Sequence, residues 1–203
     1  RSSAASDVYK RQFEACPRVA EIIVVARPAD HDAIRKTAEQ CGITKFHAIV
    51  AGGSTRQESV MCGLRALSKG TTMIAVHDGA RPLVKTEQIA QVIQDASVFG
   101  GATLGVPVKD TIKVVNDRLI VDTPYRPHLY ITQTPQVFKR QLYFEAVTFA
   151  EEHALDFTDD CQLIEAINCK VYMTEGDYTN IKITTPEDIA IAEILLARQK
   201  EEA

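Results

Sequence analysis

One segment suited to ligand binding is the stretch GGSTRQESV at residues 52–60. It lies between an apolar run that predicts a strand and a periodic run that predicts a helix. Two glycines let the backbone approach a ligand closely, and the N–H groups of a helix start bind polar ligand atoms. The same stretch also fits a helix cap. Two pairs have capping-box spacing, namely Ser54 with Gln57 and Thr55 with Glu58. The spacing leaves both interpretations open.

A second candidate is the stretch HDGARP at residues 77–82, which follows another apolar run. An aspartate at a strand end, here Asp78, is able to hold a divalent metal or a ribose. Arg81, three residues later, is suited to a phosphate group. The alternative is an Asp-Gly turn with an ion pair at the surface. His77 is interpreted as a core histidine rather than a ligand.

Three further candidates carry positive charge. The stretch PVKDTIK at residues 107–113 offers two lysines and a threonine to an anionic pocket, although the sequence alone favours solvated charges on a hairpin. Arg126 is a lone arginine in a polar stretch. Lys182 alternates with isoleucines and is expected to point away from them, toward solvent or a cleft. The sequence contains no G-x-G-x-x-G, G-x-x-x-x-G-K-[ST] or H-E-x-x-H motif.

These candidates follow short apolar runs that alternate with helical patterns in the first half of the chain. This alternation predicts βαβ units and a mostly parallel sheet with helices on both faces. In such sheets, ligands bind beyond the carboxyl ends of the strands, which is where the first two candidates lie. The expected strands are residues 21–26, 46–51, 73–77 and 102–106, the first and third of them buried, and the expected helices are residues 29–40, 56–67 and 87–98.

The rhythm changes between residues 107 and 137, where a hairpin around Asn116-Asp117 predicts an arm attached to the sheet. Thr185 and Pro186 then fit the start of a last helix. Residues 1–12 are interpreted as an unrelated or disordered tail, and residues 13–203 as a single domain. The other expected elements are strands at 111–115, 118–122, 129–132, 170–174 and 180–183, and helices at 139–152 and 159–167.

Composition limits the partners. The 203 residues are 45% hydrophobic and 25% charged, which is typical of a globular domain, and the net charge is −4. An acidic balance without a basic stripe argues against a nucleic-acid partner. No apolar run approaches the length of a membrane span. The five cysteines are odd in number and lack C-x-x-C spacing, so we expect reduced thiols in a cytoplasmic protein.

Six segments occur in one order, and together they are far more specific than any one alone. They are GGSTRQESV, VHDGARP, PVKDTIK, R-x-x-L-Y-x-x-x-TPQ beginning at Arg126, FTDD and NIKITTPED. From about Phe13 to Leu196, the chain resembles the 2-C-methyl-D-erythritol 4-phosphate cytidylyltransferase family of the non-mevalonate isoprenoid pathway. The resemblance implies a Rossmann-like nucleotidyltransferase fold with a protruding β-arm. It also implies a homodimer, Mg²⁺, and a reaction that joins CTP to a polyol phosphate and releases pyrophosphate.

The resemblance also implies roles for particular residues. Arg126 and Lys182 would position the substrate phosphate for attack, with Arg126 serving the partner's site. Asp78 would lie by the nucleotide and hold the metal. Gly52, Gly53, Ser54 and Ser59 would surround the cytosine, Gly79 would lie by the nucleotide, and Arg81, Thr111, Thr134 and Thr158 would bind the polyol phosphate.

Two departures from the family pattern affect these expectations. The family begins with a strand and a loop of the form AAGxGxRMGxxxPKQ, whose Arg and Lys embrace the triphosphate, and this sequence has no such segment. Lys10 and Arg11 lack the accompanying glycine loop. We therefore expect a chain that is truncated at its N-terminus, nearly inactive and of low stability. Ser54 stands where many members carry Asp, so contacts of that side chain with cytosine are expected to differ.

Two other functions fit the same residues. Ribitol-5-phosphate cytidylyltransferases share much of the pattern, and parallel turnover of the two polyol phosphates separates the two activities. A non-catalytic fragment that retains a nucleotide-shaped cleft is the other alternative, and it would show no Mg²⁺-dependent binding of CTP.

Overall fold

The computed structural model describes residues 12–201, and it has the α/β architecture that the sequence predicts. The predicted tail at residues 1–12 lies outside the described residues except for Gln12. That residue begins a helical turn at 12–15, which packs onto the core through Phe13 and Cys16.

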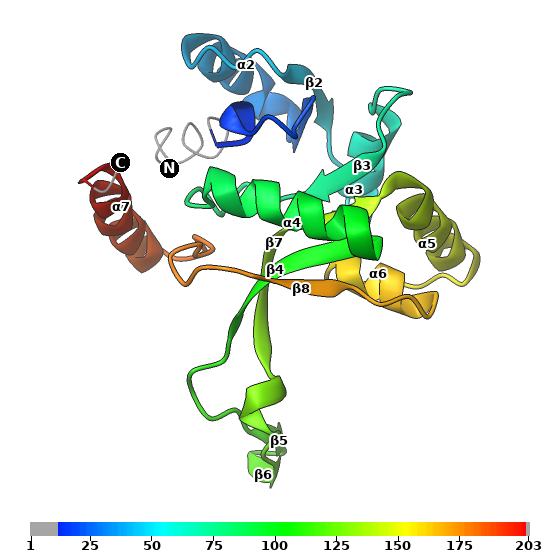
Figure 1. The fold of residues 1–203 in the computed structure, drawn as a ribbon, viewed down its shortest axis with the longest axis vertical. Coiled ribbons are helices and arrows are strands. Elements are labelled where there is room, and N and C mark those ends of the chain that lie inside the picture. The colour runs from blue at the N-terminus through cyan, green and yellow to red at the C-terminus, as the bar shows by residue number, and fades with distance from the viewer. Residues whose placement is uncertain (1–11, 202–203) are drawn as a thin grey trace.

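The strands form two sheets and a separate hairpin (Figure 1). Strands β1 (Ile22–Ala26) and β2 (Phe46–Ala51) pair in parallel. The larger sheet has the order β3-β7-β4-β8. Because β7 is antiparallel to both β3 and β4, and β8 is parallel to β4, three of its four strands point the same way. The strands of the larger sheet are β3 (Met73–Val76), β4 (Gly101–Pro107), β7 (Tyr130–Lys139) and β8 (Tyr172–Glu175).

Helices cover both faces of the larger sheet. On one face, α4 (Thr86–Phe99) packs on a cluster that includes Leu104 and Val137. On the other face, α5 (Arg140–Glu152) and α6 (Asp160–Ala166) pack around Phe138. Val137 and Phe138 are neighbours in β7, so their side chains enter opposite layers. The remaining helices are η1 (Pro28–Asp30), α2 (His31–Gln40), α3 (Arg56–Arg65) and α7 (Pro186–Glu201).

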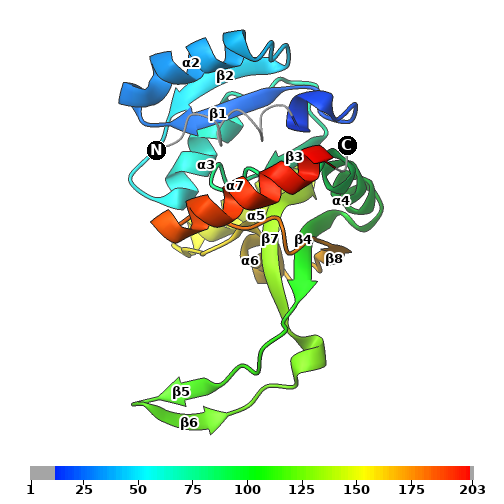
Figure 2. The same ribbon diagram turned by 90° about the vertical axis from the view of Figure 1, so that its left-hand side faces the viewer.

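The predicted arm leaves the body at the ends of β4 and β7 (Figure 2). It carries β5 (Val114–Asn116), β6 (Leu119–Asp122) and the short helix η2 (Arg126–His128). Its turn has positive φ at Asp117 (47°) and Arg118 (67°), as a type I′ turn requires. The turn is therefore centred one residue later than the Asn116-Asp117 pair that the sequence suggested.

Two strand predictions were wrong in detail. The run at residues 129–132 is the start of a ten-residue strand, β7, which continues through Pro135. A proline normally argues against an inner strand, but here the pairing of β4 with β7 is irregular between Thr103 and Gly105, at the level of Pro135. Residues 180–183 form no strand. They are instead attached to the loop after β3, where the Ile183 N–H donates to the carbonyl of Ala80.

The first and third strands are less buried than predicted. All five residues of β1 are half-buried, and only Ile74 of β3 is buried. Within residues 12–201, β1 pairs only with β2, and β3 only with β7. A strand that is covered along both edges and both faces needs neighbours that these two strands lack, so their apolar side chains stay partly exposed.

Candidate active site

The loop between β2 and α3 adopts the capped form that the sequence left as an alternative. Thr55 is the N-cap and accepts a hydrogen bond from the Glu58 N–H at 3.0 Å. The Glu58 carboxylate accepts from the Ser54 N–H at 2.6 Å and the Thr55 N–H at 3.3 Å. The hydrogen bond from the Ser54 hydroxyl, together with these two amide hydrogen bonds, lowers the pKa of Glu58. The Thr55–Glu58 pair is therefore the capping box of α3.

The same contacts occupy the amides that were expected to meet a ligand. The Gly53 N–H donates to Ser59 Oγ at 3.1 Å, and the Ser59 hydroxyl donates to the Thr55 carbonyl at 2.9 Å. A Cβ added at Gly53 would stand 2.3 Å from the Glu58 Cβ. The loop thus folds tightly around Glu58 and Ser59. A ligand that bonded to these amides would have to displace Ser59 or Glu58 from them.

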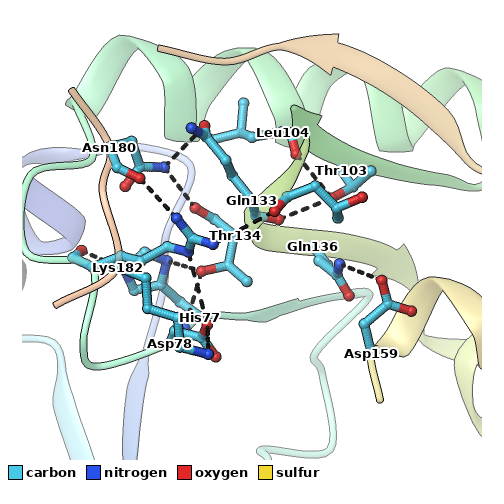
Figure 3. Close-up of polar contacts among 12 residues, drawn as sticks. His77, Asp78, Thr103, Leu104, Gln133, Thr134, Gln136, Asp159, Asn180 and Lys182 are labelled. Carbon is cyan, nitrogen blue, oxygen red and sulfur yellow. Dashed lines mark hydrogen bonds and ion pairs between the residues drawn. The ribbon is translucent and has the colours of Figure 1, made fainter. Parts of the chain in front are cut away.

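Charged side chains meet at the loop after β3. The Asp78 carboxylate lies 2.9 Å from Lys182 Nζ and 3.7 Å from Arg81 Nε (Figure 3). Burial opposes ionisation of Asp78, but its hydrogen bond with Lys182 and the charges of Lys182 and Arg81 outweigh this and lower its pKa. One carboxylate and two cations therefore meet here, although Arg81 follows Asp78 by three residues and Lys182 follows it by about a hundred.

A buried asparagine holds the two cationic loops together. Asn180 is fully buried, and its Nδ2 donates to the Thr134 carbonyl at 3.0 Å. The backbone carbonyl of Asn180 accepts from Arg81 Nη1 at 2.8 Å. Because Lys182 follows Asn180 by two residues, these bonds fix the loop that presents its ammonium group to Asp78. Sequence reasoning missed Asn180, although the motif NIKITTPED contains it.

Thr134 lies in the same network, on β7. Its hydroxyl oxygen accepts from the Asp78 N–H and contacts His77 Nδ1, both at 3.0 Å. His77 Nε2 lies 3.0 Å from the Arg81 carbonyl. Burial lowers the pKa of His77 to about 4, and the interpretation of His77 as a core histidine agrees with this geometry. The expected site residues Asp78, Arg81, Thr134 and Lys182 are thus brought together.

A second network ties α3 to α6. Asp160 is 1% exposed and accepts hydrogen bonds from Arg56 and from the Tyr143 hydroxyl. The Asp160 N–H donates to the Gln136 side chain at 2.9 Å. Burial raises the pKa of Tyr143, and the Asp160 charge adds to that effect. Thr158, an expected substrate contact, is exposed two residues before Asp160. Neither Arg56 nor Asp160 was singled out from the sequence.

The arm residues do not join these clusters within one chain. Arg126 lies in η2, is exposed, and donates to the Lys109 carbonyl at 3.0 Å. Thr111 is exposed in the segment between β4 and β5. Figures 1 and 2 show this arm projecting away from the sheets and helices. Gly79 lies in the exposed turn after Asp78.

The residues at Asp78 fit a magnesium ion only if substrate phosphates and water provide most of its ligands. Within the described part of the chain, no three His, Cys, Asp or Glu side chains gather into a metal cluster. Mg²⁺ commonly takes one or two carboxylates and completes its shell with substrate phosphates and water. The ionised Asp78 would be one such carboxylate if the ion were bound here. The described helices also include none that is long and apolar enough to cross a membrane.

A family model described as 2-C-methyl-D-erythritol 4-phosphate cytidylyltransferase matches residues 9–198. The chain belongs to this family. A cytidylyltransferase of that name from Pelotomaculum thermopropionicum is 43% identical over 192 residues, covering 93% of this chain and 81% of its relative. One from Caldanaerobacter subterraneus is 44% identical over 190 residues, covering 93% and 84%.

Solved structures of the family share the fold. The crystal structure of 4-diphosphocytidyl-2C-methyl-D-erythritol synthase from Anaerococcus prevotii matches with a TM-score of 0.87 and 31% identity, over 95% of this chain and 86% of that one. The cytidylyltransferase from Thermus thermophilus matches with a TM-score of 0.73 and 33% identity, over 91% and 86%. The predicted nucleotidyltransferase fold is therefore confirmed.

Proposed function

We propose that this chain carries the cytidylyltransferase site that joins CTP to 2-C-methyl-D-erythritol 4-phosphate, giving 4-diphosphocytidyl-2-C-methyl-D-erythritol and pyrophosphate in isoprenoid precursor biosynthesis. The observation that carries the proposal is the meeting of Lys182 and Arg81 at Asp78, in a member of this family. That cluster lies at the end of β3, the edge where open α/β sheets bind ligands.

The charge arrangement suits the reaction. A phosphate oxygen of the polyol phosphate attacks the α-phosphorus of CTP, the bond from that phosphorus to the β-phosphate breaks, and pyrophosphate leaves. Two anions must approach each other, so the site needs cations more than it needs a base. Lys182 supplies a compact charge and Arg81 a planar fork. Asp78 holds both in place before substrate arrives.

Magnesium belongs to the same proposal. Asp78 would hold the ion together with nucleotide phosphate oxygens and water, and the ion would neutralise charge on the triphosphate when bound. The Asp78→Asn variant tests this role. CTP affinity of the parent chain should rise with Mg²⁺ in calorimetry, and that rise should shrink about tenfold in the variant. An unchanged Mg²⁺ response would remove Asp78 from the metal site.

The arm supports a homodimer. Its exposed apolar side chains include Leu119 at 70%, Ile120 at 64% and Val121 at 59% exposure. An isolated two-stranded hairpin is marginally stable in water, and an exposed apolar patch commonly marks a surface that binds another protein. Arg126 lies on this arm, apart from Lys182 of its own chain. We infer that Arg126 of one chain serves the site of a second copy, and that Ile120→Glu lowers the dimer fraction in analytical ultracentrifugation.

Subunit mixing tests the shared site. In a heterodimer of Arg126→Ala with Lys182→Ala, an Arg126 that acts across the interface leaves one site with both changes and the other with neither. If Arg126 acts across the interface, mixing two inactive variants restores up to half of the activity per heterodimer. If it acts within its own chain, mixing restores none.

The deciding experiment measures CTP-dependent pyrophosphate release and, beside it, calorimetric binding of CTP and of the polyol phosphate. Turnover with 2-C-methyl-D-erythritol 4-phosphate above that with ribitol 5-phosphate supports the proposal. A preference for ribitol 5-phosphate would replace it by the alternative substrate. Absence of Mg²⁺-dependent CTP binding would leave a non-catalytic fragment. The expectation of slow turnover and low stability stays a prediction, and binding measurements do not depend on it.

A further inference from the structure

Tyr178 attaches the root of the arm to the body. It lies in the loop between β8 and Lys182, and its hydroxyl donates to the carbonyl of Pro107 at 2.7 Å. Pro107 is the last residue of β4, where the arm begins (Figure 2). The ammonium group of Lys109, two residues into the arm, lies 3.5 Å from the centre of the Tyr178 ring, within the range of a cation–π contact. One exposed tyrosine therefore holds the arm at two positions.

The loop that carries Tyr178 is itself fixed to the body. The Asp177 carbonyl accepts from the Gln133 side chain at 2.8 Å, and the Asp177 carboxylate lies 2.8 Å from Lys85 Nζ. On the other side of Tyr178, Asn180 is fully buried and its side chain donates to a carbonyl of β7. Because the loop is held on both sides of Tyr178, the contacts of this side chain constrain the arm rather than the loop.

The arm has little regular pairing at its root. Residues 108–113 belong to no helix or strand. Beyond β4, the Val108 N–H still donates to the Leu129 carbonyl at 3.0 Å. A two-stranded ribbon with few ladder hydrogen bonds opens locally at low cost. Side-chain contacts at the root therefore have a large share in setting the direction in which the arm leaves the body.

Lys109 connects this support to the arginine on the arm. Its ammonium group contacts the Tyr178 ring, and its backbone carbonyl accepts from Arg126 Nη1 at 3.0 Å. A change in the direction of the chain at Lys109 would therefore move Arg126 as well. The ammonium group of Lys109 is turned to a ring of its own chain, a contact that the sequence did not suggest.

We propose that Tyr178 and Lys109 form a latch that sets the direction of the arm, and that Tyr178 is thereby a positioning residue for Arg126 in the site of a second copy. The consequence for ligand binding rests on the proposed function, in which Arg126 acts across the interface. The rival explanation is that Tyr178 acts through Lys182, four residues later in its own chain. The two explanations place the effect of Tyr178 in different sites of a dimer.

The first test measures opening at the root of the arm without any ligand. Amide hydrogen exchange of Val108 is followed by ¹H–¹⁵N NMR in an Ile120→Glu background, so that a second copy does not cover the arm. Tyr178→Phe keeps the ring and loses the hydroxyl that holds the adjacent Pro107 carbonyl. It should speed exchange at Val108 about three- to tenfold. Lys109→Met loses the cation–π contact and should speed exchange about two- to fivefold.

Two matched variants serve as controls in the same background. Tyr172→Phe makes the same change in an exposed tyrosine of β8, and Lys170→Met removes an exposed lysine. Both should leave exchange at Val108 unchanged. Unchanged exchange in Tyr178→Phe, or equal acceleration in Tyr172→Phe, would overturn the latch.

The second test locates the effect within a dimer. Tyr178→Ala removes both contacts of the latch, and in its homodimer the affinity for 2-C-methyl-D-erythritol 4-phosphate should fall about three- to tenfold. In a heterodimer of Tyr178→Ala with Lys182→Ala, the site that keeps Lys182 receives its arm from the chain that keeps Tyr178. If the latch acts across the interface, that site binds the polyol phosphate with the parent affinity in calorimetry. If Tyr178 acts through Lys182 of its own chain, the site stays weak, and the positioning role is overturned.

The third test asks whether Tyr178 acts through Arg126. In an Arg126→Ala background, Tyr178→Ala should weaken binding of the polyol phosphate no further, because the group that it positions is already gone. The full additional loss in that background would contradict the positioning role. If the parent chain binds no polyol phosphate, the proposed function fails, and exchange at Val108 alone decides whether the latch holds the arm.

Discussion

Removal of Arg56 should destabilise the protein strongly, because it leaves a carboxylate buried without its cation. Asp160 is 1% exposed, whereas the Arg56 side chain is 36% exposed. The pKa of Arg56 is raised, since its hydrogen bond with Asp160 outweighs the opposing effect of burial. Breaking a buried ion pair from one side commonly costs about 3–5 kcal/mol. The partial exposure of Arg56 reduces this, and we expect about 2–3 kcal/mol for Arg56→Met.

For a chain of this size, each kcal/mol lowers the melting temperature by about 2–4 °C, so Arg56→Met should melt about 4–12 °C lower. The measurement is thermal unfolding at pH 7, followed by circular dichroism. Arg65→Met is the matched control, because Arg65 is an exposed arginine at the other end of the same helix. That variant should melt within about 2 °C of the parent chain.

A double variant separates the buried charge from the lost packing. Asp160→Asn removes the charge and keeps an oxygen that accepts from the Tyr143 hydroxyl. Arg56→Met with Asp160→Asn should therefore be more stable than Arg56→Met alone. The reasoning is refuted if Arg56→Met melts within about 2 °C of the parent, or if the second change gives no recovery.

Three further predictions concern the site. Lys182→Met should weaken polyol-phosphate binding about 10- to 100-fold in calorimetry, as expected for a lost charge-assisted contact, while the exposed Lys170→Met should not. Gly53→Ala should displace Glu58 and lower the melting temperature by about 2–4 °C, whereas Gly70→Ala, whose Cβ meets nothing within 4 Å, should not. Because the pKa of His77 is lower in the folded chain than in the unfolded chain, the unfolded chain binds more protons between these two values. The free energy of unfolding should therefore fall as the pH drops from about 6.5 to about 4. His77→Asn should show a shallower fall over that window, and an unchanged slope would contradict the buried neutral ring.

Periodicity located most elements and the two loops that follow β2 and β3, because those features depend on neighbours in sequence. The predicted strand at residues 46–51 has the same bounds as β2, and the loop after it was interpreted as a cap or a ligand site. Only the side-chain geometry of the structure shows that Thr55 and Glu58 form the capping box. Spacing offered two equivalent pairs, and the choice between them depends on which residue takes the extended N-cap conformation, which is Thr55.

Contacts between residues far apart in the sequence could not be predicted from periodicity and spacing. Asn180 and Arg81 are far apart in the chain, and nothing local marks Asn180 as a buried link between Arg81 and Thr134. The predicted strand at residues 180–183 failed for the same reason. Its alternating isoleucines suggested pairing with a strand, whereas the backbone of Ile183 pairs with the turn at Ala80.

The three cations proposed for the site stand on parts of the fold that differ in how firmly they are held. Arg81 and Lys182 are the cations that contact Asp78. The Asn180 side chain attaches the loop before Lys182 to β7, and the His77 ring contacts the backbone carbonyl of Arg81. Arg126 stands on an exposed hairpin, and its placement depends on what covers that hairpin. The first two should therefore keep their geometry in a monomer, whereas the contribution of Arg126 should vanish with the dimer. A dilution series that separates the copies would then lower polyol-phosphate affinity in the parent chain and leave Arg126→Ala unaffected, which no account with Arg126 acting in its own chain predicts.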